Sequence, residues 1–222
     1  MANLLVKYCT IQGTIACETG LRIGGSNEHI EIGGLENTIV RHPISDEPYI
    51  PGSSFKGKLR SLLEYRYDRR DSRNQPKGQG GRDDGEPCQC GRCLICRVFG
   101  PHKNPRHEQG PTRALFRDAQ LTEASRQVMH EARTNRGMSF SEVKTENMIT
   151  RTTGVAASPR MLERVPAGAV FDFEISVRIF NDDDEPAILA LLHEGLQLLE
   201  HDYLGAAGSR GYGKVKLSYT IV

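Results

Sequence analysis

The sequence predicts an α+β fold in which helices pack on an antiparallel sheet, with RRM-like (ferredoxin-like) topology the leading arrangement. Three observations predict it. Residues 4–17 and 169–180 alternate apolar and polar side chains, which is the period of a half-buried strand. Apolar residues recur at helical spacing after Ser53 and again from Glu185. The segment 213–222 supplies a last strand, which completes the order strand, helix, strands, helix, strand.

The first strand and the first helix follow from local signals. The strand over residues 4–17 is rich in β-branched side chains and ends at the Gly20 turn. Hydroxyl side chains at Ser53 and Ser54 are expected to cap the helix that follows. Its apolar positions are Phe55, Leu59, Leu62 and Leu63. Lys56 and Arg60, four residues apart, are expected on its solvent-facing side.

The second half of the chain is expected to hold the remaining strands and a long excursion. Residues 114–122 are a candidate strand, and residues 139–168 mix polar alternation with many basic side chains before a Pro-Ala-Gly turn. The helix that begins at Glu185 is expected to stop at Gly205. We expect one domain over residues 1–222 with excursions from its core.

Composition excludes several classes of protein. The 29 Lys and Arg nearly balance the 28 Asp and Glu, so the net charge of +1 gives no general attraction for polyanions. Any nucleic-acid site must therefore be a local patch. We find neither an apolar run of membrane-spanning length nor a basic-then-apolar amino terminus. These features favour a cytoplasmic protein without a membrane partner.

An insertion over residues 66–112 is expected to be anchored by metal. Residues 66–92 have almost no aliphatic side chains, which predicts a mobile segment. Four thiolates follow at C-x-C-x₂-C-x₂-C spacing, and they can close the tetrahedral sphere of one structural Zn²⁺. They are Cys88, Cys90, Cys93 and Cys96, which make residues 88–96 a zinc-binding module. An iron–sulfur cluster or reduced cysteines are the alternatives, and His102 or His107 could replace one thiolate.

Two stretches rich in small and basic residues suggest phosphate binding. Residues 51–64 begin like a phosphate-binding loop, but Leu59 stands where an NTPase needs a hydroxyl. Residues 205–214 place glycines beside Arg210 and Lys214, which allows backbone N–H groups to approach phosphate oxygens. A loop that merely needs left-handed backbone angles is the plainer alternative. Together the two stretches favour one extended phosphate-binding groove.

Several motifs in order resemble the RAMP superfamily, more narrowly its guide-RNA-binding backbone subunits of type III or type III-related CRISPR effector complexes. They are CETGLRIGG (17–25), YIPGSSFKGKLRSLLE (49–64), FRDAQLT (116–122), the long segment 142–175 that begins EVKTENMITR, and LLEHDYLGAAGSRGYGKV (198–215). The resemblance spans nearly the whole chain. It covers the insertion at 66–112 least well.

The resemblance implies an RRM-like core that stacks with copies of itself in a helical filament, beside other CRISPR effector subunits. Guide RNA is held through its phosphates, so that its bases pair with complementary target RNA. A thumb-like hairpin over residues 141–165 would splay one base pair, with Met148 or Ile149 as the wedge. An ordinary surface hairpin is the alternative. The implied RNA-binding residues are Arg22, Ser53, Ser54, Lys56, Arg60, Met148, Arg151, Arg160, Gly208, Ser209, Arg210, Gly211 and Lys214.

The resemblance also raises a catalytic question at Glu36. RNase subunits of this family cut target RNA with a loop aspartate and Mg²⁺, and the aligned residue here is Glu36. The extra methylene displaces the carboxylate, and a misplacement of about 1 Å can cost roughly 100-fold in rate. Cleavage is therefore expected to be weak or absent, and a solvated loop acid is the alternative. His29 and His42 lie in the same region as candidate general acid or base.

Three functions remain open on this basis. The chain is either a scaffold that holds guide RNA, or the same scaffold with Mg²⁺-dependent endoribonuclease activity through Glu36 at six-nucleotide intervals. The third is a standalone RNase that processes precursor guide RNA, as in other members of the superfamily.

Overall fold

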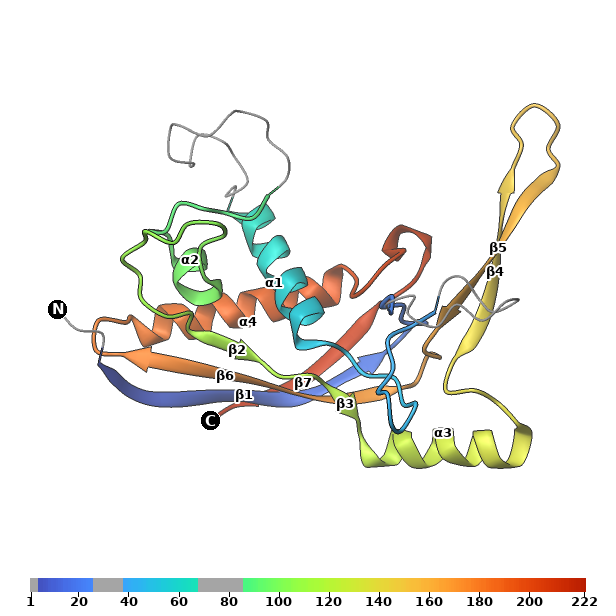
Figure 1. Ribbon diagram of the computed structural model, residues 1–222, viewed down its shortest axis with the longest axis horizontal. Helices are drawn as coiled ribbons and strands as arrows, with labels where there is room; N and C mark the ends of the chain where they lie inside the picture. Colours follow the sequence, from blue (N-terminus) through green and yellow to red (C-terminus); the bar gives the residue numbers. More distant parts are fainter. Residues whose placement is uncertain (1–3, 26–37, 68–85) are drawn as a thin grey trace.

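A computed structural model describes residues 4–25, 38–67 and 86–222. In this part of the chain the α+β prediction is confirmed, since helices accompany two antiparallel sheets (Figure 1). The elements are β1 (Leu5–Cys17), α1 (Gly52–Arg66), α2 (Leu94–Phe99), β2 (Ala114–Phe116), β3 (Gln120–Leu121), α3 (Glu123–Arg136), β4 (Glu142–Ile149), β5 (Ala156–Arg164), β6 (Val170–Phe180), α4 (Glu185–His201) and β7 (Val215–Ile221).

The main sheet has the order β2-β6-β1-β7, and β3 also pairs with β6. Alternate residues of β1 are buried, including Ile11 and Ile15, which lie opposite Ile175 and Phe171 of β6. The helices α1, α2 and α4 lie on this apolar face (Figure 1). Phe55 of α1 packs edge-on against Phe173, with ring centroids 5.4 Å apart. Strand alternation in the sequence thus decides which face of the sheet receives the helices.

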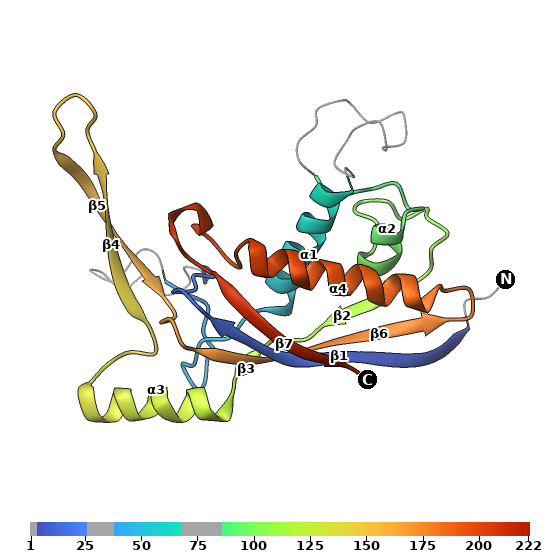
Figure 2. The same ribbon diagram turned by 180° about the vertical axis from the view of Figure 1, so that it is seen from behind.

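The strands β4 and β5 form a separate hairpin that projects from the body (Figure 2). Glu142 lies opposite Arg164, and Glu146 lies opposite Arg160. The register shifts between Glu146 and Met148, where the strand carries an irregularity. The hairpin falls within the segment 141–165, where the resemblance implies one.

The start of α1 differs from the expectation. Neither Ser53 nor Ser54 caps the helix, because α1 begins at Gly52 after Pro51, which makes no side-chain capping bond. Instead the Gly52 amide donates to Asp118 Oδ1 at 2.7 Å. Residues 114–122 form two short strands rather than one, and Asp118 lies in the break between β2 and β3.

Three further features of the helices differ from the prediction or were not predicted. The helix α4 ends at His201, four residues before the expected Gly205. The helix α3 was not predicted, because most of its side chains are exposed and only Ser125 is buried. The short helix α2 begins at Leu94, directly after Cys93, whose sulfur caps the helix by accepting from the Cys96 amide at 3.4 Å. Among the described helices, none has the length and apolar character needed to cross a bilayer.

Candidate functional site

The Gly-rich segment 205–214 is a compact loop between α4 and β7. Gly208–Arg210 forms one 3₁₀ turn, flanked by left-handed residues at Ala207 and Gly211. Gly213 is required by space as well as by its positive φ of 69°, because a Cβ there would lie 1.9 Å from the Leu204 carbonyl oxygen. At Gly213, therefore, the backbone conformation of the loop is enough to explain why the residue is glycine. The loop still leaves Ser209 and Arg210 exposed at its tip.

Lys58 links the start of α1 to this loop. Its Nζ lies 3.3 Å from Asp202 Oδ1 and 3.6 Å from the centroid of the Tyr203 ring. Gly208 also packs against the Tyr203 ring, so closely that a Cβ there would lie 2.0 Å from it. The two small-residue stretches predicted to form one groove are therefore neighbours in space. Sequence reasoning did not assign Lys58 or Tyr203, although their cation–aromatic pairing is a common one.

Lys56 is a half-buried cation that pairs with no carboxylate among the described residues. Its pKa is lowered, first by burial and then by the nearby positive charges of Arg60 and Arg178. An ammonium in such a position gains from an anion supplied by a ligand. Lys56 therefore suits contact with a phosphate.

Arg60 does not face solvent, contrary to the expectation. Its side chain is 12% exposed, and Nε donates to Glu64 Oε1 at 2.7 Å. Its Nη1 donates to the Gly100 carbonyl at 2.8 Å and its Nη2 to the Cys88 carbonyl at 2.9 Å. The guanidinium is thus committed to the protein interior, where it joins α1 to the cysteine module.

The hairpin base lies against the Gly-rich loop. Arg210 Nε lies 3.0 Å from Glu146 Oε2 of β4. Tyr212 is almost fully buried, with Lys144 Nζ 4.5 Å and the Arg164 guanidinium carbon 5.0 Å from its ring centroid. Burial, followed by the nearby Glu146 carboxylate, raises the pKa of Tyr212 to about 12. The only sequence signal for Tyr212 was an aromatic side chain between two loop glycines.

The hairpin tip is exposed and partly apolar. Met148 and Ile149 are 59% and 56% exposed, and they line a hollow with Arg151 and Gly154. Arg160 is also exposed, on the strand opposite. Exposed apolar side chains beside cations suit a surface that meets both bases and phosphates.

The remaining predicted positions have mixed surroundings. Ser53 is exposed and Ser54 is partly buried in the first turn of α1. The Arg22 carbonyl accepts from the Ala206 amide at 2.8 Å, which ties that segment to the Gly-rich loop. Lys214 is 60% exposed and lies 3.8 Å from a Glu18 carboxylate oxygen.

Glu36 and His29 lie outside the described residues. His42 is described, and its Nδ1 accepts from the Ile44 and Ser45 amides at 3.4 Å each. This arrangement shapes a turn, so His42 has a structural role in addition to any chemical one.

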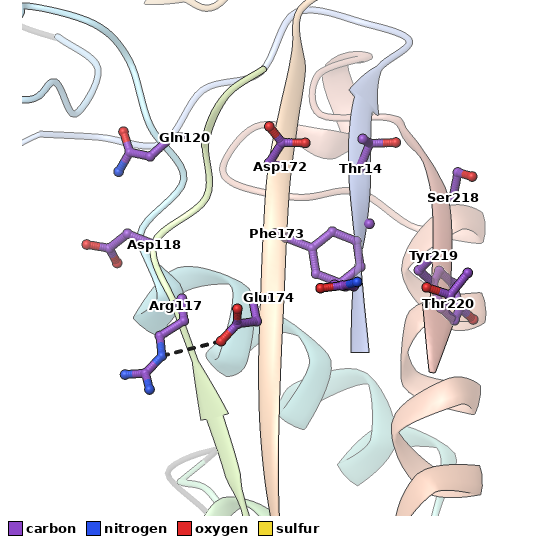
Figure 3. Close-up of a pocket in the computed structure, with 12 residues that line it drawn as sticks. Thr14, Arg117, Asp118, Gln120, Asp172, Phe173, Glu174, Ser218, Tyr219 and Thr220 are labelled. Carbon is purple, nitrogen blue, oxygen red and sulfur yellow. Dashed lines mark ion pairs between the residues drawn. The ribbon is translucent and has the colours of Figure 1, made fainter. Parts of the chain in front are cut away.

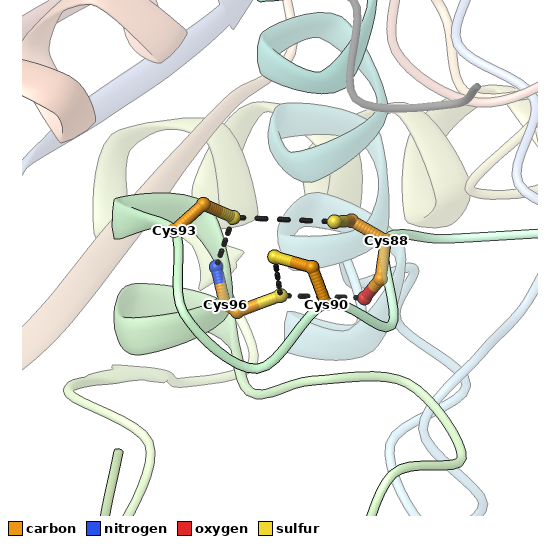
Figure 4. A group of neighbouring side chains, drawn as sticks. All are labelled: Cys88, Cys90, Cys93 and Cys96. Atoms are coloured by element: carbon orange, nitrogen blue, oxygen red, sulfur yellow. Dashed lines mark hydrogen bonds between the residues drawn. The ribbon is translucent and has the colours of Figure 1, made fainter. Parts of the chain in front are cut away.

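The four cysteines of the insertion come together. Their ligand atoms all lie within 4.8 Å of one another, and no histidine belongs to the group within the described chain (Figure 4). The Sγ atoms of Cys88 and Cys93 are 3.9 Å apart, and those of Cys90 and Cys96 are 3.8 Å apart. Four sulfurs bound tetrahedrally to zinc at about 2.3 Å would be separated by roughly 3.8 Å. The cluster therefore has the dimensions of a metal site.

Thiol chemistry at this cluster points the same way. Hydrogen bonds from Cys88 and Cys96 lower the pKa of Cys93. The contact with Cys93 raises the pKa of Cys88 to about 12. Four crowded sulfurs thus cannot all ionise by themselves, but a bound cation compensates their charge.

The uncovered face of the main sheet has a different character (Figure 3). A hollow of about 780 Å³ on that face is lined by polar residues that include Gln12, Asp172 and Glu174. Arg117 lies 3.8 Å from Glu174 and offsets part of the negative charge. Such a surface disfavours phosphates, whereas the Gly-rich loop and the hairpin carry exposed cations.

Comparison with known proteins identifies the family: the chain belongs to the RAMP superfamily, whose sequence profile it matches over residues 14–216. It is 43% identical, over 95% of its length and 83% of the relative's, to the "CRISPR system Cms endoribonuclease Csm3" of Methanothermobacter thermautotrophicus. The protein of the same name from Streptococcus thermophilus is 40% identical over 94% of this chain and 87% of its own.

A solved structure extends the likeness to the fold. The "Csm3-Csm4 subcomplex in the type III-A CRISPR-Cas interference complex" superposes with a TM-score of 0.59 at 29% identity. The match covers 98% of this chain and 79% of the other. The RAMP resemblance inferred from the motifs is thereby confirmed.

Proposed function

We propose that this chain is a guide-RNA-binding backbone subunit of a type III CRISPR effector complex, in which the guide pairs with complementary target RNA. The names of its relatives and the CRISPR complex that contains its structural neighbour support this assignment. One structural observation carries it: α1, the Gly-rich loop and the hairpin base are joined through Lys58, Tyr203 and the Arg210–Glu146 pair. These contacts bring three segments that are distant in sequence next to one another, which supports one shared RNA-binding surface.

The proposed RNA-binding residues follow this surface. Backbone amides and cations take the phosphates, while the hairpin tip inserts Met148 or Ile149 beside a base pair as a thumb. Arg60 is not included, because its guanidinium is bound internally. The residues proposed to contact RNA are Arg22, Ser53, Ser54, Lys56, Met148, Arg151, Arg160, Gly208, Ser209, Arg210, Gly211 and Lys214.

A salt titration tests this interface. We compare two double variants. The first combines Lys56→Gln and Arg210→Gln. The control combines Lys7→Gln and Arg117→Gln, which removes two positive charges from other faces of the molecule. The first pair is expected to weaken guide-RNA binding and to reduce its salt dependence, because fewer counterions are released. Equal behaviour of the two double variants would reject the proposed surface.

Several finer features belong to the same proposal. The strand order β2-β6-β1-β7, with one helix after β1 and one after β6, supports an RRM-like core. Within one domain over residues 1–222, the insertion 66–112 would carry the metal module. We further propose that copies of the chain stack as a filament beside other effector subunits, in the cytoplasm.

The metal is proposed to be a structural Zn²⁺ held by Cys88, Cys90, Cys93 and Cys96. Four thiolates leave no position open for a reacting group, so the ion would only hold the insertion together. Arg60 donates to the Cys88 carbonyl and the Cys88 amide donates to Glu64, and these two bonds would carry that order to α1.

Endoribonuclease activity is a second candidate, favoured by the word "endoribonuclease" in the relatives' names. Glu36 and Mg²⁺ would carry it. The assembled complex is incubated with complementary RNA and Mg²⁺, with Glu36→Gln as the comparison. Regularly spaced products that vanish in Glu36→Gln would establish the enzyme, whereas intact target would leave the scaffold alone.

A further inference from the structure

The root of the hairpin is held by a buried carboxylate that the RNA-binding surface does not use. Glu163, near the end of β5, is 6% exposed. Its Oε2 accepts from the Ile39 amide at 2.8 Å. Its Oε1 accepts from Arg41 Nη2 at 2.6 Å and from the Ser141 hydroxyl. One side chain of the hairpin thus binds the segment that contains Ile39 and Arg41 through hydrogen bonds.

Arg41 extends this contact to the rest of the body. Its Nη2 also donates to Ser141 Oγ at 2.7 Å, and its Nη1 donates to the Asp46 carbonyl at 3.1 Å. Asp46 Oδ2 in turn lies 3.1 Å from Arg133 Nη1 of α3. The hairpin, the turn after Arg41 and α3 therefore share one polar network.

The charge of Glu163 is maintained by its partners. Burial alone would raise the pKa of Glu163, but the bonds from Ser141, the Ile39 amide and Arg41 together lower it. A buried ion pair contributes little to stability compared with apolar packing, and its best-attested use is to specify one arrangement. The network therefore suits the setting of an angle or a register.

The opposite side of the root is held differently. There Glu142 receives a bond from Arg164 Nε at 2.7 Å, and Tyr212 packs against Arg164. Glu142 remains 40% exposed. It pairs within the hairpin, whereas Glu163 pairs across to another segment, which makes Glu142 a matched control.

We propose that Glu163 is a positioning residue which, through Arg41, fixes the direction in which the hairpin leaves the body. It thereby determines which base pair of the guide–target duplex Met148 meets. This inference rests on the proposed function, since it assumes that the hairpin separates a base pair. Glu163 itself does not touch RNA.

The test uses the assembled complex with guide RNA and a set of target RNAs, each carrying 2-aminopurine at one position. This base becomes brighter when it is unstacked, so the set maps where the hairpin opens the duplex. Wild type is expected to give a sharp maximum that Met148→Ala removes. Glu163→Ala and Arg41→Ala are expected to flatten or shift this maximum, whereas Glu142→Ala leaves it in place.

The outcomes separate the two ideas. If wild type shows no fluorescence maximum along the target, Met148 does not open the duplex, and the positioning role of Glu163 is rejected as well. If wild type and Met148→Ala behave as expected but Glu163→Ala matches wild type, the positioning role is overturned while the wedge stands. Thermal unfolding of each variant before assembly shows whether it is folded.

Two further variants make the role specific. Glu163→Gln keeps one carbonyl acceptor but loses the charge, and it is expected to restore the maximum in part. The double variant of Glu163 and Arg41 to Ala is expected to equal either single variant, because the two act as one unit. Additive effects, or full loss in a folded Glu163→Gln variant, would contradict a role through Arg41.

Discussion

The two basic stretches of this protein, the start of α1 and the Gly-rich loop, use their charges differently. In α1, Arg60 is 12% exposed and bonded to the carbonyls of Cys88 and Gly100, and Lys58 is 18% exposed and paired with Asp202. In the loop, Arg210 and Lys214 remain 56% and 60% exposed. Similar composition thus yields an internal brace in one region and a surface cation in the other.

Arg60 is mostly buried and Arg210 is exposed because α1 and the Gly-rich loop have different neighbours. The insertion brings the carbonyl oxygens of Cys88 and Gly100 to α1, and a guanidinium with five donors can bond both of them together. The loop after α4 is bounded by its own tight turns and leaves the side chains of Ser209 and Arg210 exposed. Arg60 is therefore expected to act on stability, and Arg210 on RNA affinity.

Loss of the metal module should have the largest effect on the contrast between Arg60, which acts on stability, and Arg210, which acts on RNA affinity. Cys93→Ser, or treatment with a strong chelator, is expected to remove about one zinc per chain and to unfold residues 88–100. Arg60 would then lose its carbonyl partners, and α1 would fray near its end. Elemental analysis measures the metal, and hydrogen exchange measures the protection of α1.

A variant of a free thiol provides the control for that experiment. Cys17→Ser changes a buried cysteine of β1 that lies outside the cluster, and it should keep the metal. Iron in the purified protein, or no metal in protein prepared without chelator, would rule out a zinc site.

Arg60→Gln is expected to give the next largest effect. It leaves the buried Glu64 carboxylate without its ionic partner, although the Cys88 amide still donates to it, and such a loss typically costs about 3 kcal/mol of unfolding free energy. Urea unfolding measures this loss. The salt slope of RNA binding should stay unchanged in the folded fraction, and a reduced slope would show that Arg60 contacts RNA after all.

Lys56→Gln, one turn earlier on the same helix, should behave in the opposite way. Its pKa is lowered by burial and by neighbouring cations, so removal of its charge relieves repulsion. Stability should stay equal or rise slightly, while guide-RNA affinity falls. If Lys56→Gln instead destabilised the chain without any change in RNA binding, the division of roles along α1 would fail.

These pairs also show what the sequence could and could not reveal. Alternation correctly predicted β1 and β6, because buried faces impose it on any strand. Arg60 could not be assigned, because its acceptors lie 28 and 40 residues away in a segment without regular pattern. Helix α3 was missed because it buries only Ser125, so it lacks the apolar stripe by which a helix is recognised.

The candidate site could be predicted only in part, because many of its contacts join segments that are distant in the sequence. Glycines, serines and cations identified the two stretches, and cysteine spacing identified the cluster. Contacts made by single side chains, such as Lys58 on Tyr203 and Glu163 on Arg41, carry no periodic signal. They depend on which distant segments meet, and folding decides that.

Arg210→Gln is expected to give a moderate effect confined to RNA binding. The loss of one phosphate contact should reduce the salt slope by about 0.7 and leave the urea midpoint unchanged, because the side chain is mostly exposed. Glu146→Gln is the companion variant, since it releases Arg210 from its intramolecular partner. It should strengthen binding, and weaker binding would show that Glu146 holds Arg210 in place for RNA.

The smallest expected effect concerns pH and the junction between α3 and the turn at Glu47. Burial would raise the pKa of Glu47, but bonds from His130 and Arg126 lower it below its ordinary value of 4.5. A carboxyl with a lowered folded-state pKa stabilises the fold above 4.5, and this contribution is lost as the pH falls through the folded-state pKa. Urea midpoints measured from neutral pH downward should therefore fall less steeply in Glu47→Gln, which forfeits at most about 1 kcal/mol at neutral pH. Glu123→Gln removes an exposed partner of Arg126 and should retain the wild-type pH profile; identical profiles for all three proteins would place the acid sensitivity elsewhere.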